Sequence, residues 1–520
     1  MNKKIRRLIL PSLILVVGLL LRVLWLEQSP PSVNWDEAAL GYNSYSLLKT
    51  GADEYGRRWP LTLRSFDDYK GAIYSYLTIP FISLGGLRAA TVRLPSVLAG
   101  TGLILMAFLL GKKLFNRKVG LGAMVAAAVS PVMILLSRTA FEANLALMLL
   151  MTGVYLVTKE KDKRKLIIGY ILLVVSMYTY HTEKIVAPLV ILMSLIEVYK
   201  REGKEEAAKL AIWPALVGLP LVINLLWGGG SSRLIHTSIA KLWPFYPSYG
   251  WENWLALPYY LGIELWGRVA AMFSPATLFV RGSSEPGQRL IETGILPLGL
   301  ALPWLVGWYE VIRKKNKEVL RLMAIWLVIT LISWNWFSLI RGLPAIFWHC
   351  LVIGVGIERL IKKKKVLTLI LAGALLLETV QTTNANWMSL PAYQSGDYQG
   401  GMEAMVKEVM KVEDKYDRVV IDSPQAQTYI FFLFYSQFDP VEEQRLSSQL
   451  SEEELKEHTR LGKFEFRQTA WLSDSQKPGL IVTNSINVSD EKIEQIESAK
   501  LIGKTVNNFG DEQYRLIEIN

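Results

Sequence analysis

The feature that most constrains the fold is a series of long apolar segments in the first two thirds of the chain. The whole sequence is 51% hydrophobic and 20% charged, with a mean hydropathy of +0.26. A helix of about 20 apolar residues crosses a bilayer. We place eleven such segments at 8–27, 92–111, 119–137, 141–158, 166–180, 185–199, 208–227, 292–312, 319–338, 342–361 and 366–382. The chain is therefore predicted to be an α-helical polytopic membrane protein.

Clusters of basic residues predict how the segments cross the membrane, because short cytoplasmic loops are rich in Lys and Arg. The clusters fall at every second junction, which puts the N-terminus in the cytoplasm and the C-terminus outside. The net charge of +11 is thus attributed to these loops and not to nucleic-acid binding. The clusters are Lys3 to Arg7, Lys112 to Lys118, Lys159 to Lys165, Lys200 to Lys209, Arg313 to Lys317 and Lys362 to Lys365.

A shorter apolar segment, Ala72 to Gly86, would reverse this orientation if it spanned the membrane. It has about 15 residues and contains Pro80, so we interpret it as a helix in the outer interface.

Two domains follow from the change in composition near residue 384. Residues 1–384 form the transmembrane domain, with a first outer loop at 28–91 and a second large outer loop at 228–291. Residues 385–520 alternate helical and strand-like stretches, which predicts a soluble extracytoplasmic α/β domain. Its segment 427–440 is aromatic enough to be a core helix, or else a surface that packs on the membrane part.

The first outer loop holds the best candidate for chemistry. Asp36 and Glu37 begin a helical stretch that Gly51 ends as a C-cap. A carboxylate fixed on a rigid element beside the membrane can accept a proton from a hydroxyl group. The alternative is that the pair only complements the helix dipole.

The end of the same loop holds a second acidic pair, Asp67 and Asp68, followed by Lys70. Asp68 and Lys70 could form no more than a solvated pair. Otherwise Lys70 neutralises an anionic substrate group, and Asp68 orients an acceptor or binds a divalent cation.

Further charged residues fall on the predicted outer face, away from the cytoplasmic clusters. A cation at the depth of a span end needs water or an anion, and a lipid-linked phosphate would be such an anion. Arg138 and Glu142 could also be a plain ion pair at a span end, and His181 could only reach toward the interface. The residues are Arg93, Arg138, Glu142, His181, Lys184, Arg281 and Arg341, with Trp243, Tyr246, Trp251 and Arg289 in the second large loop.

The Asp-Glu pair after the first span, the loop that ends in Lys70, and Arg93-Leu94-Pro95-Ser96 at the second span resemble GT-C glycosyltransferases. The resemblance is to the bacterial protein O-mannosyltransferase and aminoarabinose-transferase group. It implies a GT-C fold, with Asp36 as general base and Glu37 as its neighbour. The chain departs from the aminoarabinose enzymes at Asp68-Tyr69-Lys70-Gly71 and at Glu142.

This resemblance implies an inverting glycosyltransferase of a bacterial plasma membrane. It would move a sugar from a polyprenyl-phosphate donor to an extracytoplasmic acceptor hydroxyl. No cofactor is required, although a divalent ion could bind at Asp36 and Asp68. Two alternatives stay open, a transporter or flippase of a lipid-linked anion and a non-catalytic sensor. The predicted site consists of catalytic Asp36 and Glu37, phosphate-binding Arg93, Arg138, His181, Lys184 and Arg281, and substrate-binding Asp68, Lys70, Glu142 and Arg341.

Overall fold

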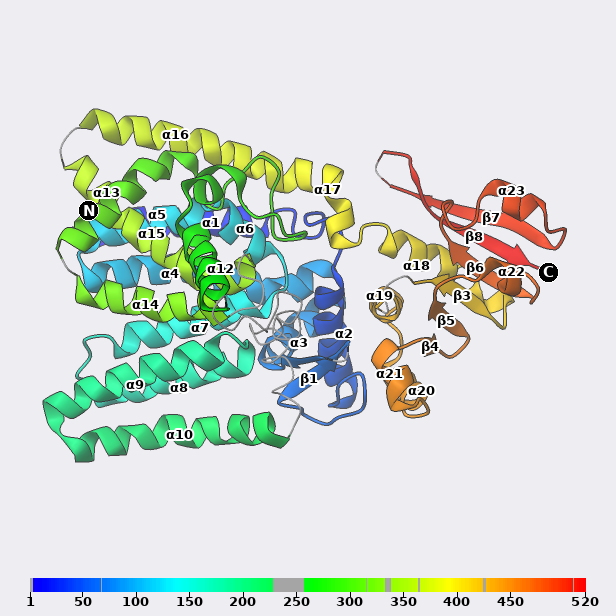
Figure 1. Ribbon diagram of the computed structural model, residues 1–520, viewed down its shortest axis with the longest axis horizontal. Coiled ribbons are helices and arrows are strands. Elements are labelled where there is room, and N and C mark those ends of the chain that lie inside the picture. Colours follow the sequence, from blue (N-terminus) through cyan, green and yellow to red (C-terminus); the bar gives the residue numbers. More distant parts are fainter. Residues whose placement is uncertain are drawn as a thin grey trace. The chain divides into compact units, whose positions relative to one another are not determined.

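The computed structural model describes residues 3–66, 68–227, 257–314, 316–332, 338–362, 365–423, 427–507 and 509–520 (Figure 1). Its internal contacts divide the chain into two compact units. The helical unit comprises Met1–Leu24 and Pro95–Met388, and the mixed unit comprises Trp25–Leu94 and Ser389–Asn520. The predicted first outer loop and the predicted soluble domain therefore fall in one unit.

The helical unit consists of long helices joined by short connections (Figure 1). Its largest apolar core is shared by residues of α4, α5, α7, α8, α9 and α15. The helices are α1 (Lys3–Val23), α4 (Ala89–Leu114, whose first residues belong to the mixed unit), α5 (Arg117–Val129), α6 (Pro131–Arg138), α7 (Glu142–Val157), α8 (Lys163–Thr179), α9 (Glu183–Glu202), α10 (Lys204–Trp227), α12 (Leu257–Phe273), α13 (Ala301–Arg313), α14 (Lys317–Ile332), α15 (Leu339–Ile361) and α16 (Lys365–Asn384), with shorter turns η2 (Thr277–Arg281), η3 (Leu298–Leu300) and η4 (Ala385–Ser389).

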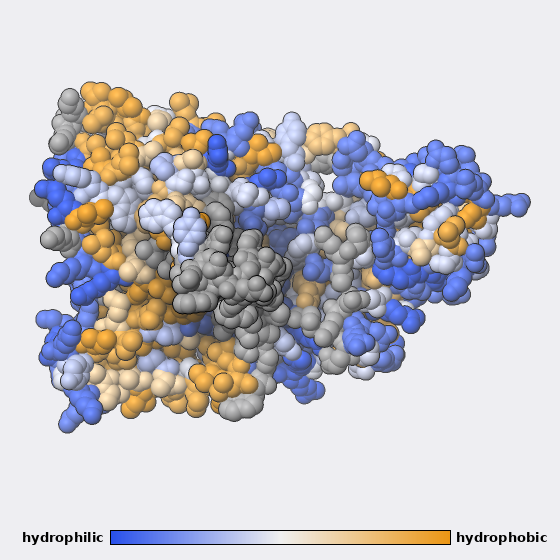
Figure 2. All heavy atoms as spheres, viewed as in Figure 1, coloured by the Kyte–Doolittle hydropathy of each residue, from blue (hydrophilic) through white to orange (hydrophobic). Residues whose placement is uncertain are grey.

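Several of these helices present apolar side chains outward. Within the described residues, four helices are long and apolar enough to cross a membrane, or five if the bent pair α5 and α6 forms one span. Leu216 and Leu226 on α10, and Leu369 and Leu377 on α16, are more than half exposed. Figure 2 shows hydrophobic surface over both helices. Such continuous exposed apolar faces fit contact with lipid, and the chain is a membrane protein.

Each of the eleven predicted segments overlaps a helix, but the number of spans and their orientation stay predictions. The segment 119–137 is broken at Ser130 and Pro131, where the two helices meet at 59°. The segment 292–312 is helical only from Leu298 onward. Helix α12 lies where the sequence predicted an outer loop.

The mixed unit combines a helix–hairpin–helix segment with a six-stranded sheet. The first part contains α2 (Trp35–Thr50), the antiparallel strands β1 (Thr62–Ser65) and β2 (Asp68–Gly71), and α3 (Ile73–Gly85). The sheet order is β4-β5-β3-β6-β8-β7, with β3 parallel to β5 and β6 and the other neighbours antiparallel. Its strands are β3 (Val419–Asp422), β4 (Arg460–Leu461), β5 (Phe464–Arg467), β6 (Gly479–Thr483), β7 (Ala499–Val506) and β8 (Glu512–Ile519).

The six-stranded sheet confirms the prediction that the C-terminal region contains a sheet. Short helices connect its strands, as in other α/β domains. The segment 427–440 forms α19 (Tyr429–Tyr435), in which Tyr429 to Phe434 are buried. This helix packs against α2, so the aromatic segment is a core helix of the mixed unit. The other helices are α17 (Leu390–Tyr393), η5 (Ser395–Tyr398), α18 (Met402–Met410), η6 (Glu413–Lys415), α20 (Pro440–Ser447), α21 (Glu452–Glu457), α22 (Trp471–Asp474) and α23 (Asp490–Glu494).

Candidate active site

The first turn of α2 positions the two acids that the sequence singled out. Asn34 caps the helix, because its side chain accepts a hydrogen bond of 2.9 Å from the Glu37 amide. The Asn34 amide in turn donates to Glu37 Oε2 at 3.2 Å, which completes a capping box. Gly51 ends the helix at φ 72°, as predicted. Asp36 and Glu37 are therefore held at a helix start, where the dipole favours negative charge.

Glu37 and Arg93 form a fully buried ion pair. Arg93 Nε and Nη2 donate to the two carboxylate oxygens of Glu37 at 2.9 and 3.1 Å. The remaining donors reach the carbonyl oxygens of Leu26, Pro30 and Ser32. A guanidinium group has five N–H donors, and all five are used, so Arg93 has none left for the phosphate that the sequence assigned to it.

Asp36 has the opposite environment. Its side chain is 30% exposed, and its Oδ1 is bound by the ammonium group of Lys70, which is only 4% exposed. Lys70 lies on β2 opposite Leu63, and its ammonium group also lies 5.2 Å from the centre of the Phe66 ring. Of the two acids, Asp36 is therefore the one that a substrate can reach.

Asp68 begins strand β2, two residues before Lys70. Its Oδ1 accepts a hydrogen bond of 2.8 Å from the Tyr69 amide. Its neighbour Asp67 lies outside the described residues, as do Trp243, Tyr246 and Trp251. No group of three or more His, Cys, Asp or Glu within the described ranges could hold a metal ion. Metal binding at Asp36 and Asp68 stays a prediction.

Arg138 is fully buried at the end of α6 in the helical unit. Its Nη1 donates to the carbonyl oxygens of Leu21, Arg22 and Leu24, at 3.3, 3.1 and 2.7 Å. These carbonyls lie at the C-terminal end of α1, where a cation complements the helix dipole. At least one guanidinium nitrogen of Arg138 thus supports the fold.

Glu142, His181 and Arg341 lie at one end of the helical unit. Each is adjacent in the sequence to a residue of one apolar cluster. The cluster consists of Ala143, Ala146 and Tyr180, with Ile340 packed against it. Lys184 lies one residue beyond Glu183, the first residue of α9, and Arg281 is exposed at the end of η2.

Arg341 differs from Arg93 and Arg138 in its hydrogen bonding. It lies in the first turn of α15, and its Nε and Nη1 are buried with no hydrogen-bond partner among the residues that the structure describes. A buried unpaired donor is costly, so this side chain is suited to an anionic ligand.

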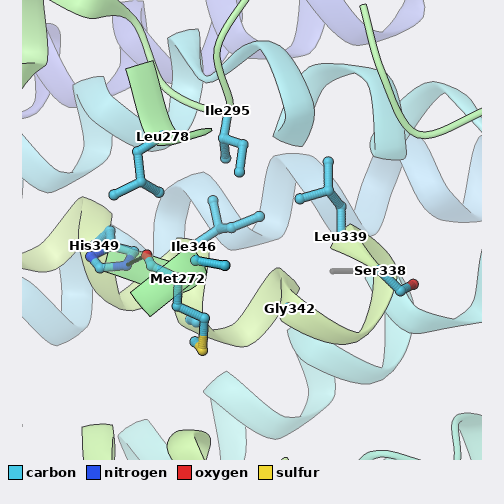
Figure 3. Close-up of a pocket in the computed structure, with 10 residues that line it drawn as sticks. Met272, Leu278, Ile295, Ser338, Leu339, Gly342, Ile346 and His349 are labelled. Carbon is cyan, nitrogen blue, oxygen red and sulfur yellow. Dashed lines mark hydrogen bonds between the residues drawn. The ribbon is translucent and has the colours of Figure 1, made fainter. Parts of the chain in front are cut away.

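A small pocket, about 40 Å³ in volume and partly open to the surface, lies beside the start of α15 (Figure 3). Its walls are mostly apolar and come from α12, η2 and α15, and Leu339 and Gly342 are the lining residues on either side of Arg341 in the chain. His349 closes one side, where its Nδ1 accepts a hydrogen bond of 3.0 Å from Trp304 and its Nε2 lies 3.2 Å from the Met272 carbonyl oxygen. The lining residues are Ala271, Met272, Leu278, Ile295, Ser338, Leu339, Gly342, Ala345, Ile346 and His349.

The structure thus brings together Asp36 with Lys70 and Glu37 with Arg93, all in the mixed unit. Asp68 also belongs to the mixed unit. The remaining predicted site residues belong to the helical unit, namely Arg138, Glu142, His181, Lys184, Arg281 and Arg341.

Comparisons with known proteins define the class. Residues 70–227 match the family model of dolichyl-phosphate-mannose-protein mannosyltransferases. Solved structures match almost the whole chain, and they confirm the resemblance noted in the sequence: the chain has the fold of GT-C glycosyltransferases. No curated protein matches it.

Among these structures, ArnT from Cupriavidus metallidurans in the apo state has a TM-score of 0.57 at 10% identity, over 98% of this chain and 97% of that one. ArnT from the same organism bound to undecaprenyl phosphate has a TM-score of 0.50 at 12% identity, over 99% and 98%. The oligosaccharyltransferase AglB from Archaeoglobus fulgidus, in complex with an inhibitory peptide and a dolichol-phosphate, has a TM-score of 0.50 at 12% identity, over 84% and 64%.

Proposed function

We propose that this protein is an inverting membrane glycosyltransferase that uses a polyprenyl-phosphate sugar as donor and an extracytoplasmic hydroxyl group as acceptor. The observation that carries the proposal is the accessible carboxylate of Asp36, fixed at a helix start by a buried lysine. The mannosyltransferase family match and the ArnT structure with bound undecaprenyl phosphate support the type of donor.

In the proposed reaction, Asp36 takes the proton of the acceptor hydroxyl group. The acceptor oxygen then bonds to the anomeric carbon from the face opposite the leaving group. The bond between that carbon and the phosphate oxygen breaks, and the lipid phosphate leaves with the electron pair. A single base and an in-line attack invert the anomeric centre, since retention needs a second carboxylate as nucleophile.

In this proposal Glu37 does not transfer a proton; it helps to hold the start of α2 in place. Its two oxygens are bound by Arg93 and the Asn34 amide, and its side chain is buried. Lys70 likewise acts on Asp36, whose carboxylate it holds in one orientation. General base catalysis is worth roughly 10²–10⁴-fold, so interactions with the leaving phosphate must supply much of the remaining acceleration.

For the lipid phosphate, Arg341 is the strongest candidate. Its two unpaired guanidinium nitrogens and its place in the first turn of α15 favour an anion. The small pocket beside that turn has mostly apolar walls, so the turn borders apolar surface. His181, Lys184, Arg281 and Arg138 stay proposed phosphate ligands, and Arg138 also binds carbonyl groups at the end of α1.

The test is reconstitution in liposomes with a labelled polyprenyl-phosphate sugar and a cell-envelope acceptor fraction. We expect Asp36→Asn to lose turnover by at least about 100-fold while remaining folded at the assay temperature, which thermal unfolding of the same preparation checks. Asp414→Asn, at an exposed acid in η6 that has no part in the predicted site, serves as the matched control, and we expect it to retain the wild-type activity. Undiminished turnover in Asp36→Asn would overturn the assignment of the base.

We also propose a bacterial plasma membrane location with residues 385–520 outside the cytoplasm. Protease added to intact spheroplasts should remove this region. Cleavage only after the cells are lysed would contradict this orientation.

A further inference from the structure

The sheet-containing C-terminal part of the chain contacts α2 at its entry, middle and exit. At the entry, the Tyr435 hydroxyl group lies 2.9 Å from Ser32 Oγ and accepts a hydrogen bond of 3.3 Å from the Val33 amide. Ser32 Oγ in turn donates to the Val33 carbonyl oxygen at 3.3 Å. This leaves the Tyr435 hydroxyl hydrogen for Ser32, so one side chain of α19 binds the two residues before the Asn34 cap.

The same short segment is bound from its other side by the buried ion pair. Arg93 Nη2 donates to the Ser32 carbonyl oxygen at 2.5 Å, and Arg93 also binds Glu37 in the first turn. Burial raises the pKa of the Tyr435 hydroxyl group, which therefore stays protonated and neutral. A continuous set of hydrogen bonds thus runs from Tyr435 through Ser32 and Arg93 to Glu37, which is adjacent to Asp36.

In the middle of α2 the two parts approach closely. A Cβ atom at Gly41 would lie 2.6 Å from Cε2 of Phe434 and 2.8 Å from Cγ2 of Val92, so a larger residue there would force these side chains to shift. One residue further along the helix, the Tyr42 hydroxyl group donates to the Phe438 carbonyl oxygen at 3.1 Å. Glycine is therefore needed here for packing and not for a special backbone conformation.

At the exit of α2, a single amide holds the last turn. Gln444 Nε2, on α20, lies 3.1 Å from Ser46 Oγ, 3.0 Å from Thr50 Oγ1 and 3.0 Å from the Asp53 carbonyl oxygen. With the entry and middle contacts, this fixes both the tilt of α2 and its position along its own axis.

We infer that the C-terminal domain is a positioning element of the catalytic site, and that Tyr435 is a positioning residue which sets the place of Asp36 through Ser32 and Val33. The inference rests on the proposed role of Asp36. A displacement of about 1 Å at a catalytic group can cost up to 10²-fold in rate, so a domain that fixes the position of Asp36 can control turnover.

The experiment compares Tyr435→Phe with Tyr416→Phe in the full-length protein reconstituted in liposomes. Both changes remove one hydroxyl group from the mixed unit, but Tyr416 donates to Glu518 at 2.8 Å, far along the chain from α2 and its cap. We expect Tyr435→Phe to lower kcat about tenfold with an unchanged KM for the donor. Tyr416→Phe should behave as the wild type.

A second measurement reports the position of the segment without any activity. Amide hydrogen exchange at Val33 should be faster in Tyr435→Phe, because its acceptor is gone, and unchanged in Tyr416→Phe. Wild-type kcat in Tyr435→Phe would overturn the inference. Equal losses of kcat and melting temperature in both variants would overturn it too, since they would show only general destabilisation.

The two proposals fail in different ways. If Asp36→Asn is inactive and Tyr435→Phe is fully active, the base stands and the positioning role falls. If Asp36→Asn is active while Tyr435→Phe has the lower kcat and the faster exchange, the positioning role stands and the base must be sought elsewhere near the start of α2.

Discussion

The two faces of the first turn of α2 carry the same kind of charge pair in opposite surroundings. On the buried face, Glu37 and Arg93 are both inaccessible, and every donor of the arginine is used. On the open face, Lys70 is buried but Asp36 keeps 30% of its surface exposed. The two adjacent acids therefore differ: Glu37 fixes the helix start, and Asp36 is exposed, as the proposed general base must be.

The largest expected effect comes from breaking the buried pair. Removal of one partner of a buried ion pair typically costs about 3–5 kcal/mol, because the other charge is left without compensation. We expect Arg93→Met to lower the melting temperature strongly in detergent, and Glu37→Gln to lower it less because the amide can still accept from Arg93. The measurement is thermal unfolding followed by tryptophan fluorescence.

A double variant sharpens this result. In Arg93→Met with Glu37→Met no buried charge is left, so part of the lost stability should return. Full recovery is not expected, since the carbonyl groups of Leu26, Pro30 and Ser32 also lose their donor. A double variant less stable than Arg93→Met alone would contradict the view that uncompensated charge dominates.

The open pair should respond in the reverse manner. In Lys70→Met, Asp36 loses the group that orients it but keeps access to water, so the free energy of unfolding should change little. Turnover should fall about tenfold because the carboxylate is no longer held in one place. Kinetics and unfolding are measured on the same preparation. If Lys70→Met lost as much stability as Arg93→Met but kept the wild-type turnover, the distinction between the two faces would be wrong.

The local part of this arrangement could be predicted from the sequence, and the long-range part could not. Asn34, Glu37 and Gly51 are cap residues at fixed offsets, so the bounds of α2 follow from a few neighbouring residues. The partners of Asp36 and Glu37 are 34 and 56 positions away. No short-range sequence pattern reveals these partners. The sequence therefore predicted that Arg93 binds the donor phosphate, whereas in the structure it binds Glu37.

The same difference holds for the whole fold. Strand β6 is a fully buried, mostly apolar run, and such a run can be recognised directly in the sequence. Strand β7 is an edge strand in which exposed residues such as Lys500 and Lys504 alternate with partly buried ones. Because it contains no continuous apolar run, its sequence does not mark it as a strand. The contacts of α2 with Tyr435 and Gln444 join residues about 400 positions apart, so the sequence could suggest the C-terminal domain but not what it touches.

Arg341 extends the comparison to the helical unit. Arg93 has every donor satisfied by the protein, whereas two buried nitrogens of Arg341 have no partner within the described part of the chain. We expect Arg341→Gln to raise the KM for the lipid-linked donor about tenfold, since a hydrogen bond to a charged group is worth about 1.5–3 kcal/mol. Its melting temperature should stay near that of the wild type. An unchanged KM in Arg341→Gln would remove this residue from the donor site.

The smallest effect, and the one with a distinct pH signature, is expected at Glu54, just beyond the exit of α2. Burial, together with the nearby Glu443 and Asp53, raises the pKa of Glu54 well above its usual 4.5, although its hydrogen bond from Asn43 at 3.2 Å opposes the shift. The folded state therefore holds a proton that the unfolded chain releases. Stability should fall as the pH rises above about 4.5, because the unfolded state then binds fewer protons than the folded state.

Glu54→Gln copies the protonated form and keeps an oxygen for Asn43, so it should remove this contribution to the pH dependence. We expect its melting temperature to equal that of the wild type near pH 4 and to exceed it by a few degrees at pH 8. Glu403→Gln, in an exposed pair with Lys407, is the matched control and should show no such divergence. A gap between Glu54→Gln and wild type that narrowed as the pH rose would mean that Glu54 is ionised in the folded protein.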